Sequence, residues 1–237
     1  MEKQTLLYEG KAKQVYSTNE PNILWVHFMD QVTALNGKRK TQIAQKGQLA
    51  SAISDYLFNY LTDKGIANHY LKKVGPVDQL VKKVEILPLE VVVRNLAAGH
   101  FVTKYGVPMH QKLTATIHEF YLKNDELDDP FMNDEQIMAL NLATKAEIAT
   151  LKAQADLVNQ YLTTLFKEIN IELVDFKLEF GYDETQTLIL ADELSPDNMR
   201  LLDMTTHASL DKDVFRQQSG DMTSGYQIVL DRLINRK

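Results

Sequence analysis

The sequence predicts an α+β fold in which an N-terminal antiparallel sheet and a larger α+β C-terminal lobe lie on either side of a cleft. Three observations predict it. Short strand-like runs crowd the first third of the chain, amphipathic helices follow further along, and a charged hairpin lies within residues 171–203. At 237 residues the chain can bury a large core, either as one domain or as two lobes.

Composition narrows the class of protein. The chain is 44% apolar and 24% charged, as in an ordinary soluble globular protein, and its net charge of -6 argues against general nucleic-acid binding. It has no cysteine, which excludes disulfides and thiolate chemistry. No signal-peptide core opens the sequence, and no apolar run approaches the roughly 18 residues of a membrane span. We therefore expect a cytoplasmic protein with no membrane or nucleic-acid partner.

The first element is a small antiparallel sheet. Strand-like runs at Leu6–Tyr8 and Gln14–Tyr16 flank a glycine loop, and Ile23–Phe28 supplies a third strand after a turn. Glycine lets the backbone approach a ligand closely, so that Lys11 and Lys13, at alternate positions, can reach one polyphosphate. The alternative is a plain hairpin with solvated lysines, because the spacing is not that of a Walker loop.

The middle of the sequence predicts structural strands, helices and loops around one candidate anion-binding residue. Arg94 ends a strand-like run beside a short helix, which is a favourable place for an anion. The expected elements are a basic loop at Asp30–Gly47, a helix from Gln48 to Gly65, strands at Leu80–Val84 and Leu89–Val93 joined by a hinge at Glu85–Pro88, a helix at Ala97–Tyr105 and an acidic loop at Leu122–Pro130.

The last part of the chain is mostly helical. A capping box at Thr144–Glu147 opens a long amphipathic helix that runs to Ile169. Lys212 and Arg216, four residues apart, share one face of a second helix, where an exposed charge pattern is the alternative to a site. A final amphipathic helix covers Tyr226–Ile234.

The hairpin between these helices places charge where a buried strand normally has none. In Leu173–Phe180 the alternation turns Val174, Phe176, Leu178 and Phe180 toward a core and leaves Asp175, Lys177 and Glu179 on the opposite face. A second strand, Thr187–Leu194, delivers Asp192 and Glu193, and Arg200 follows just beyond the strand end. Carboxylates that converge without Cys or His suit magnesium, whose other ligands a nucleotide's phosphates usually supply. The alternative is a solvated outer face.

Five stretches together resemble one family. LVDFKLEFG and DELSPDNMR, with YEGKAK near the start, RNLAAGH in the middle and DKDVFR near the end, resemble the SAICAR synthetases, ligases of purine biosynthesis. The resemblance implies a nucleotide lobe like that of protein kinases and ATP-grasp enzymes over residues 1–86, and a substrate and catalytic lobe over residues 87–237. It also implies that ATP, Mg²⁺, carboxyaminoimidazole ribotide (CAIR) and L-aspartate are the ligands, that the products include ADP and phosphate, and that the assembly is a homodimer.

The resemblance also implies the site residues. Nucleotide contacts fall on Lys11, Ala12, Lys13, Val15, Leu24, Val84, Ile86 and Lys123, although the four apolar residues are equally compatible with a plain core. Metal contacts fall on Glu179, Asp192 and Asp129. The catalytic group is Asp175, Lys177, Glu179 and Asp192, in which Asp175 orients either Lys177 or the incoming amine. Substrate contacts fall on Arg94, His100, Ser195, Arg200, Lys212 and Arg216.

One position departs from the family pattern. The family usually has serine where this chain has His100, whose imidazole can carry a positive charge that a hydroxyl cannot. Alternatively, His100 packs against Phe101 or Tyr105.

Two other functions fit the same residues. A small-molecule kinase would need no amine cosubstrate. A nucleotide-sensing module would bind ATP without turnover, but the anion-binding residues beyond the first lobe argue against it.

Overall fold

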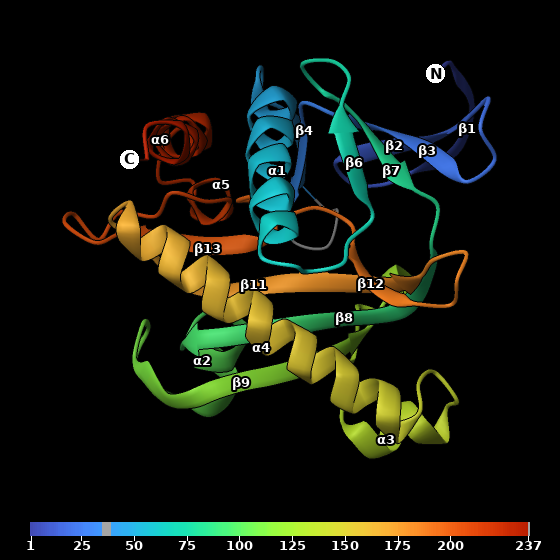
Figure 1. Cartoon of the computed structure of the whole chain (residues 1–237). Helices are drawn as coiled ribbons and strands as arrows, with labels where there is room; N and C mark the ends of the chain where they lie inside the picture. Colours follow the sequence, from blue (N-terminus) through green and yellow to red (C-terminus); the bar gives the residue numbers. More distant parts are fainter. Residues whose placement is uncertain (35–38, 237) are drawn as a thin grey trace.

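The computed structural model describes residues 1–34 and 39–236, and it folds into a five-stranded sheet, a six-stranded sheet and helices packed around them (Figure 1). The expected α+β class is confirmed. None of the described helices is long and apolar enough to cross a membrane.

The five-stranded antiparallel sheet has the strand order β1-β2-β3-β7-β6. Its strands are β1 (Lys3–Glu9), β2 (Lys13–Thr18), β3 (Ile23–Phe28), β6 (Tyr70–Lys73) and β7 (Asp78–Lys82). The first three confirm the strands expected from the sequence, with the glycine loop between β1 and β2. Backbone hydrogen bonds hold that loop in place, since Gly10 N donates to Lys13 O at 2.8 Å and Met29 N donates to Ala12 O at 2.9 Å.

The segment expected to be a basic loop is partly a hairpin. Gln31–Ala34 (β4) and Arg39–Gln42 (β5) pair antiparallel as a separate two-stranded sheet, so the loop prediction is wrong there. Residues 35–38 of that stretch lie outside the described residues. The expected helix follows as α1 (Lys46–Asp63), and Gly65, at a φ of 81°, continues the chain in a conformation that favours glycine.

The second sheet has the order β10-β9-β8-β11-β12, and β13 pairs with β11. Its strands are β8 (Glu85–Leu96), β9 (Lys112–Leu122), β10 (Phe131–Met132), β11 (Ile171–Tyr182), β12 (Leu188–Ala191) and β13 (Met199–Asp203). The predicted β11–β12 hairpin is confirmed. The expected start of the second strand at Leu89 is wrong, because β8 already pairs with β11 from Glu85 onward. The hinge role of Glu85–Pro88 stays a prediction. Arg200 lies beyond the end of β12, as expected, but inside β13, a strand that was not predicted.

The helices match the predictions in kind but differ at their ends. The short helix α2 (His100–Tyr105) begins three residues later than expected, and α5 (Asp213–Gln217) begins after Lys212. The capping box at Thr144 is confirmed, and α4 (Lys145–Glu168) follows it. The last helix is α6 (Met222–Ile234). Two helical elements were not expected, a 3-10 turn at Asp125–Leu127 and α3 (Asp134–Ala139).

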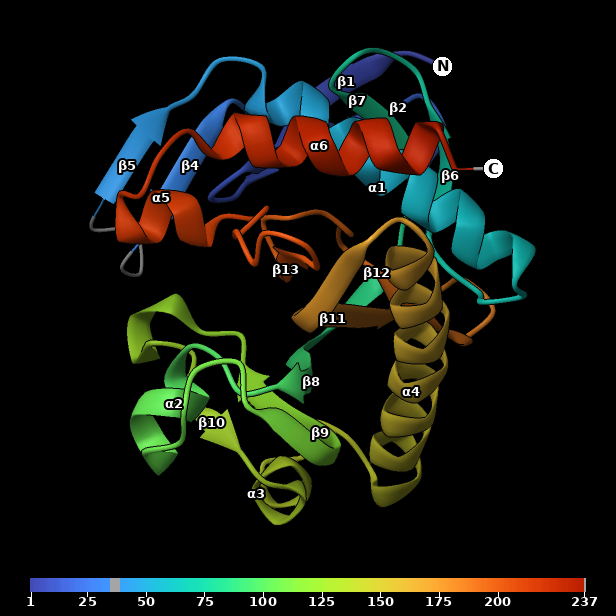
Figure 2. The same cartoon turned by 90° about the vertical axis from the view of Figure 1, so that its left-hand side faces the viewer.

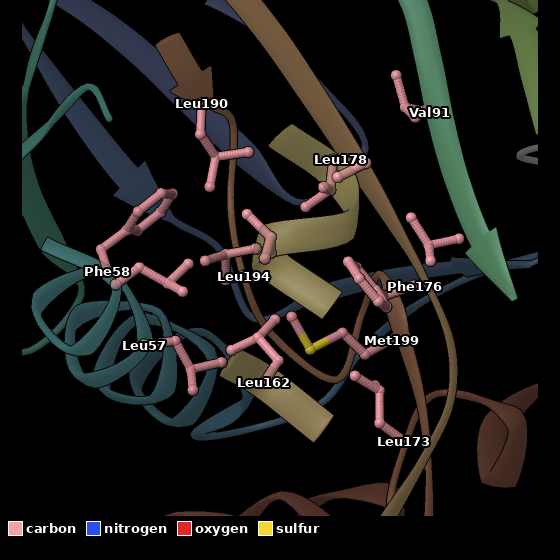
Figure 3. Packing of buried hydrophobic residues seen from close by; sticks show 14 of the residues in the cluster. Leu57, Phe58, Val91, Leu162, Leu173, Phe176, Leu178, Leu190, Leu194 and Met199 are labelled. Carbon is pink, nitrogen blue, oxygen red and sulfur yellow. The ribbon is translucent and has the colours of Figure 1, made fainter. Parts of the chain in front are cut away.

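One hydrophobic core joins both sheets. The helix α4 runs along one face of the six-stranded sheet, and α1 lies between the five-stranded sheet and α6 (Figures 1 and 2). Figure 3 shows Leu57 and Phe58 of α1 facing Leu162 of α4 and Phe176 of β11 within this core. The sheets change between Lys82 and Glu85, and a division into domains at residue 86 stays a prediction.

One core prediction needs correction. Val174 was expected on the same buried face as Phe176, but it lies in a separate small cluster with Leu96, Ala98 and Leu202. The pairing of β11 with β13 shifts register between Leu173 and Asp175, and this irregularity breaks the alternation.

Candidate active site

The charged face of β11 is largely buried. Asp175 is 3% exposed and Glu179 is 4% exposed, while the side chain of Lys177 between them is 27% exposed. The alternative of a solvated outer face is therefore wrong for the two acids. Buried charges persist where partners compensate them, and each of these three side chains has at least one ionic partner within 4 Å.

Lysines and acids alternate around Glu179. Lys177 Nζ lies 2.6 Å from Glu90 Oε1 on β8 and 2.9 Å from Glu179 Oε1. Lys123, just after β9, forms an ion pair with the other oxygen of Glu179. Burial alone would lower the pKa of Lys177, but Glu179, Asp192 and Glu90 outweigh it and hold that pKa well above its usual value. Lys177 is therefore a fixed positive charge and not a general base.

Asp192 brings the glycine loop into this cluster. It follows β12 directly and forms an ion pair with Lys13 of β2, whose Nζ also lies 3.8 Å from Glu193 Oε1. Burial would raise the pKa of Asp192, but Lys13 and Lys177 outweigh it, and the pKa is lowered far below its usual range. Asp192 is thus a permanent anion between a lysine of each sheet.

The acids suit a metal ion that a nucleotide helps to hold. Among the described residues no group of three or more His, Cys, Asp or Glu side chains is arranged to hold a metal. Two carboxylates, Glu179 and Asp192, influence the same lysine, Lys177. Magnesium commonly takes one or two carboxylates and completes its shell with phosphate oxygens and water, so this donor set fits it.

Asp129 lies in the same region but is held by its own loop. Its Oδ1 accepts a hydrogen bond of 2.9 Å from Asn124 N, and its charge contributes to raising the pKa of Glu90, whose main cause is burial. Lys11 of the glycine loop lies 2.6 Å from Asp125 of the 3-10 turn. These contacts join the loop at residues 123–130 to the acid and lysine cluster.

A second charged group surrounds the other end of β11. Asp175 Oδ2 lies 2.5 Å from Arg94 Nη1 and 2.9 Å from Arg200 Nη1. Each arginine has another acid, since Arg94 Nε lies 2.8 Å from Glu119 and Arg200 Nε lies 2.8 Å from Asp213. Burial would lower the pKa values of both guanidinium groups, but the acids outweigh it and raise them. Two fixed cations thus lie beside one another.

Backbone geometry places His100 next to this arginine group. Gly99, at a φ of 55°, packs so closely on Arg200 that an added Cβ would lie 2.7 Å from Nη2. His100 follows it as the first residue of α2 and is exposed. The rings of Phe101 and Tyr105 pair with each other at 4.7 Å between centroids, a pairing in which His100 takes no part.

A third group lies at the turn after β12. Lys46, fully buried at the start of α1, forms an ion pair with Asp197, which also accepts a hydrogen bond of 2.8 Å from Tyr226 Oη. Burial lowers the pKa of Lys212 to about 8, against the opposing effect of Asp197. Ser195 is also fully buried, and its Oγ accepts a hydrogen bond of 3.1 Å from Asp197 N.

Arg216 belongs instead to the arginine group, since its Nη1 lies 2.5 Å from Asp213 Oδ1. Of the two residues expected on one helix face, Arg216 thus pairs with Asp213, whereas Asp197 is the acid with the largest effect on the pKa of Lys212. Their contacts with substrate stay predictions.

Four apolar residues were expected to contact the nucleotide's adenine base, and three of them lie on strands of the two sheets. Val15 and Leu24 lie on β2 and β3 and pack against the core cluster. Ile86 is 38% exposed on β8, and Val84 precedes that strand. Gly181 lets β11 approach there, because an added Cβ would lie 2.8 Å from the Glu85 carbonyl oxygen and 3.0 Å from Val84. Their contact with a base stays a prediction.

Sequence reasoning missed several charged residues of these groups. Glu90 carries the same signal as Glu179, an acid within a strand-like apolar run, and was overlooked. Asp213 lies inside DKDVFR and was passed over for its basic neighbours. No local pattern marks the others, which are Lys46, Glu119, Asp197 and Tyr226.

Comparison with known proteins gives a consistent result over nearly the whole chain. A family model described as SAICAR synthetase matches residues 6–233. The phosphoribosylaminoimidazole-succinocarboxamide synthase of Oenococcus oeni is 58% identical over 98% of this chain and 97% of its own length. The crystal structure of the synthase of the same name from Ehrlichia chaffeensis has a TM-score of 0.95 at 42% identity, covering 98% of this chain and 99% of that one. A SAICAR synthetase in complex with ADP has a TM-score of 0.93 at 39% identity, covering 97% and 98%.

Proposed function

The chain belongs to the SAICAR synthetase family, and from this premise we propose which of its residues carry out an ATP-dependent ligation. The enzyme joins CAIR to L-aspartate and converts ATP to ADP and phosphate, in purine biosynthesis. The observation that carries the proposed assignment is the gathering of buried Glu179 and partly buried Asp192 around one lysine, Lys177, with Lys123 and Lys13 paired to them.

The chemical difficulty is that a carboxylate is a poor electrophile. In the proposed route, an oxygen of the CAIR carboxylate attacks the γ-phosphorus of ATP, the bond to the β-γ bridging oxygen breaks, and ADP leaves. The aspartate amine then attacks the acyl carbon, inorganic phosphate departs, and the nitrogen loses a proton. Phosphoryl transfer of this kind needs positioning and charge neutralisation more than covalent help.

Lysines supply much of the neutralisation at the phosphates. Lys11 and Lys13 at the glycine loop, with Lys123 after β9, are the proposed nucleotide contacts, and Lys177 is proposed to neutralise the reacting carboxylate. Its raised pKa supports this role, because it keeps the charge throughout the neutral pH range. Asp175 is proposed to orient Arg94 and Arg200, which lie within 2.9 Å of it, and not the incoming amine.

Magnesium is the proposed metal. Glu179 and Asp192 would hold it together with ATP phosphates, and Asp129 is the proposed acid nearby. Bound there, the ion would polarise the γ-phosphoryl group and offset its charge. The lysines that pair with these acids would then exchange part of their contacts for phosphate oxygens.

The arginine group is proposed to bind the ribotide. Arg94 and Arg200 present two guanidinium groups at one place, which suits the bidentate recognition of phosphate or carboxylate. His100 adjoins Gly99, which packs on Arg200, so its proposed contact is with the same anion. Ser195, Lys212 and Arg216 are proposed to complete the substrate contacts.

The proposed assembly is a homodimer in the cytoplasm. Every residue of β1 is exposed, and β1 is an edge of the five-stranded sheet. Two copies of β1 paired antiparallel about Leu6 would place Lys3 of each opposite Glu9 of the other, so the edge is complementary to itself. Sedimentation equilibrium should give a dimer for the wild type and a monomer for Leu6→Lys, while Leu71→Lys on the opposite edge strand β6 should stay dimeric. A monomeric wild type would refute the dimer.

The catalytic assignment is tested by product formation. ADP release should require CAIR and aspartate together, and neither alone should sustain it. Glu179→Gln and Asp192→Asn keep the side-chain shape but remove a negative ligand, so each should lower kcat and raise the magnesium concentration needed for half-maximal rate. Asp156→Asn, which alters an acid that pairs with His118, is the matched control. Unchanged magnesium dependence in both site variants would show that these acids are not metal ligands.

A further inference from the structure

A short segment connects the five-stranded sheet to β12, the strand that Asp192 follows. Ala67, Asn68 and His69 lead from α1 into β6 and run parallel to β12. Leu190 N donates to Ala67 O at 3.1 Å, and His69 N donates to Leu190 O at 2.9 Å. On its other side the segment is part of the five-stranded sheet, because Lys82 N donates to His69 O at 2.7 Å.

The side chain of His69 adds a contact to Asp192, two residues beyond Leu190. It is buried, with the residue 6% exposed, and its ring packs at 5.3 Å between centroids on Phe58 of α1. Its Nε2 lies 3.0 Å from the backbone carbonyl oxygen of Asp192. A carbonyl oxygen only accepts hydrogen bonds, so this partner assigns the proton to Nε2.

Asp192 has a backbone conformation that is unfavourable unless the surrounding structure stabilises it. Its φ of 63° lies in the left-handed region, which is uncommon for residues other than glycine. Such a conformation persists where the surroundings hold it, and it ends β12 so that the carboxylate meets Lys13. The bond from His69 fixes the peptide plane that follows the Asp192 Cα.

We propose that His69 is a positioning residue for the ligation: its hydrogen bond to the Asp192 carbonyl holds the Asp192 carboxylate in the place where it meets the nucleotide's metal. The inference rests on the proposed role of Asp192 in binding magnesium. Because His69 lies between α1 and β6, it also fixes this carboxylate relative to the sheet that carries Lys11 and Lys13. Loss of the donor leaves this carbonyl without its His69 partner and frees the peptide to rotate.

The test uses variants that separate the effect of the hydrogen-bond donor from the effect of the ring's packing on Phe58. His69→Gln keeps a donor at about the distance of Nε2, His69→Asn keeps a donor that is too short to reach, and His69→Leu keeps the apolar contact with Phe58 and removes the donor. His118→Leu is the matched control, because it removes another partly buried ring, on β9, whose Nε2 lies 2.9 Å from Asp156 Oδ1 of α4. Thermal unfolding of each full-length variant establishes that it is folded.

The first readout is binding and not turnover. The magnesium concentration that gives half-maximal ADP binding, measured by calorimetry, should rise about 10-fold to 100-fold in His69→Leu and His69→Asn, the range typical for loss of a partner that orients a metal ligand. The His69→Gln variant should stay within about 3-fold, since it can make the same hydrogen bond. In turnover, kcat should fall in the first two variants while the KM for CAIR stays near the wild-type value, because the arginine group is untouched.

Each outcome decides the proposal. If Asp192→Asn changes the magnesium dependence and folded His69→Leu and His69→Asn do not, the inference is wrong while the metal site stands. If His69→Gln is as impaired as His69→Leu, packing and not the hydrogen bond is responsible, and the inference is again wrong. If Asp192→Asn itself leaves the magnesium dependence unchanged, the metal assignment fails and the inference fails with it.

Discussion

Asp175 offers the sharpest test of the electrostatic design, because it is the acid that two arginines share. Asp175→Asn is isosteric and removes one negative charge from a position that is 3% exposed. The carboxylate lies 2.5 Å from Arg94 and 2.9 Å from Arg200, so the variant leaves two neighbouring guanidinium groups without their common counterion. An asparagine amide also turns a donor toward one of them.

The expected cost follows from burial. Breaking a buried ion pair costs about 3–5 kcal/mol, and the lower end applies here because each arginine keeps a second acid, Glu119 or Asp213. The Arg200 side chain is also 21% exposed, which further reduces the loss. We expect the free energy of unfolding to fall by about 3 kcal/mol, equivalent to a drop of about 6–12 °C in Tm for a chain of this size.

Urea titration followed by circular dichroism measures this change, with Asp156→Asn as the control. The side chain of Asp156 is 56% exposed in its pair with His118, so its loss should cost at most about 1 kcal/mol. Inorganic phosphate should stabilise Asp175→Asn more than the wild type, because the two arginines then need an anion. A loss below about 1 kcal/mol in Asp175→Asn, or equal stabilisation by phosphate, would refute the view that Asp175 compensates both arginines.

Three other changes test single side chains. Lys177→Met should lower kcat and kcat/KM together by about 100-fold or more while ADP still binds, because a charge that neutralises the transition state is lost; lost ADP affinity with unchanged kcat would contradict this. His100→Ser should weaken CAIR binding more at pH 6 than at pH 8, and parallel KM profiles for the two proteins would show that the imidazole charge does not matter. Burial, with the like charge of Asp213, raises the pKa of Asp211 from 3.8 to about 6, so the folded state binds this proton more tightly than the unfolded state does. The contribution of Asp211 to stability should therefore fall as pH rises from about 4 to 6, and the difference in unfolding free energy between wild type and Asp211→Asn should change in that window and be constant above it.

Local patterns predicted the strands and helices whose signals lie within the segment. Ile23–Phe28 is a strand with the predicted bounds, and Thr144 caps a helix as its motif requires. The same signature at Asn133, with Gln136 three residues later, opens α3, so that helix was predictable and was missed. In each of these cases the residues that decide the structure are neighbours in sequence.

Elements fixed by distant pairing were not predictable in the same way. Glu85–Pro88 contains a proline and was expected to join two strands as a hinge, yet Ile86 pairs with Gly181 and Glu85 with Tyr182, which extends β8 through it. Arg200 follows a turn signal, yet it pairs with Asp175 across β11 and β13. Neither partner can be inferred from the segment itself, because a local turn preference competes with hydrogen bonds that only the folded sheet supplies.

The same distinction holds for the charged side chains of the site: those within one strand could be predicted from the sequence, and those from distant segments could not. The alternation of Asp175, Lys177 and Glu179 was readable because one strand contains all three. The side chains that compensate them come from β8, β13 and the loops after β9 and β12, and Lys46 meets Asp197 from the start of α1. A sequence shows that a strand carries unusual charge, whereas only the fold shows which neighbours neutralise it.

The spacing along β11 explains why one strand can serve two groups of charges. Side chains on one face of a strand repeat every second residue, about 6.6 Å apart, so Asp175 and Glu179 lie about 13 Å apart on the same face. The arginines gather at the first and the lysines with Asp192 at the second, which separates the proposed ribotide phosphate from the proposed metal. Lys177 lies midway between them, where a carboxylate of the ribotide would meet the γ-phosphoryl group of ATP. With the proposed roles, Lys177 would therefore serve both groups, whereas a cation moved by one residue would point to the core instead.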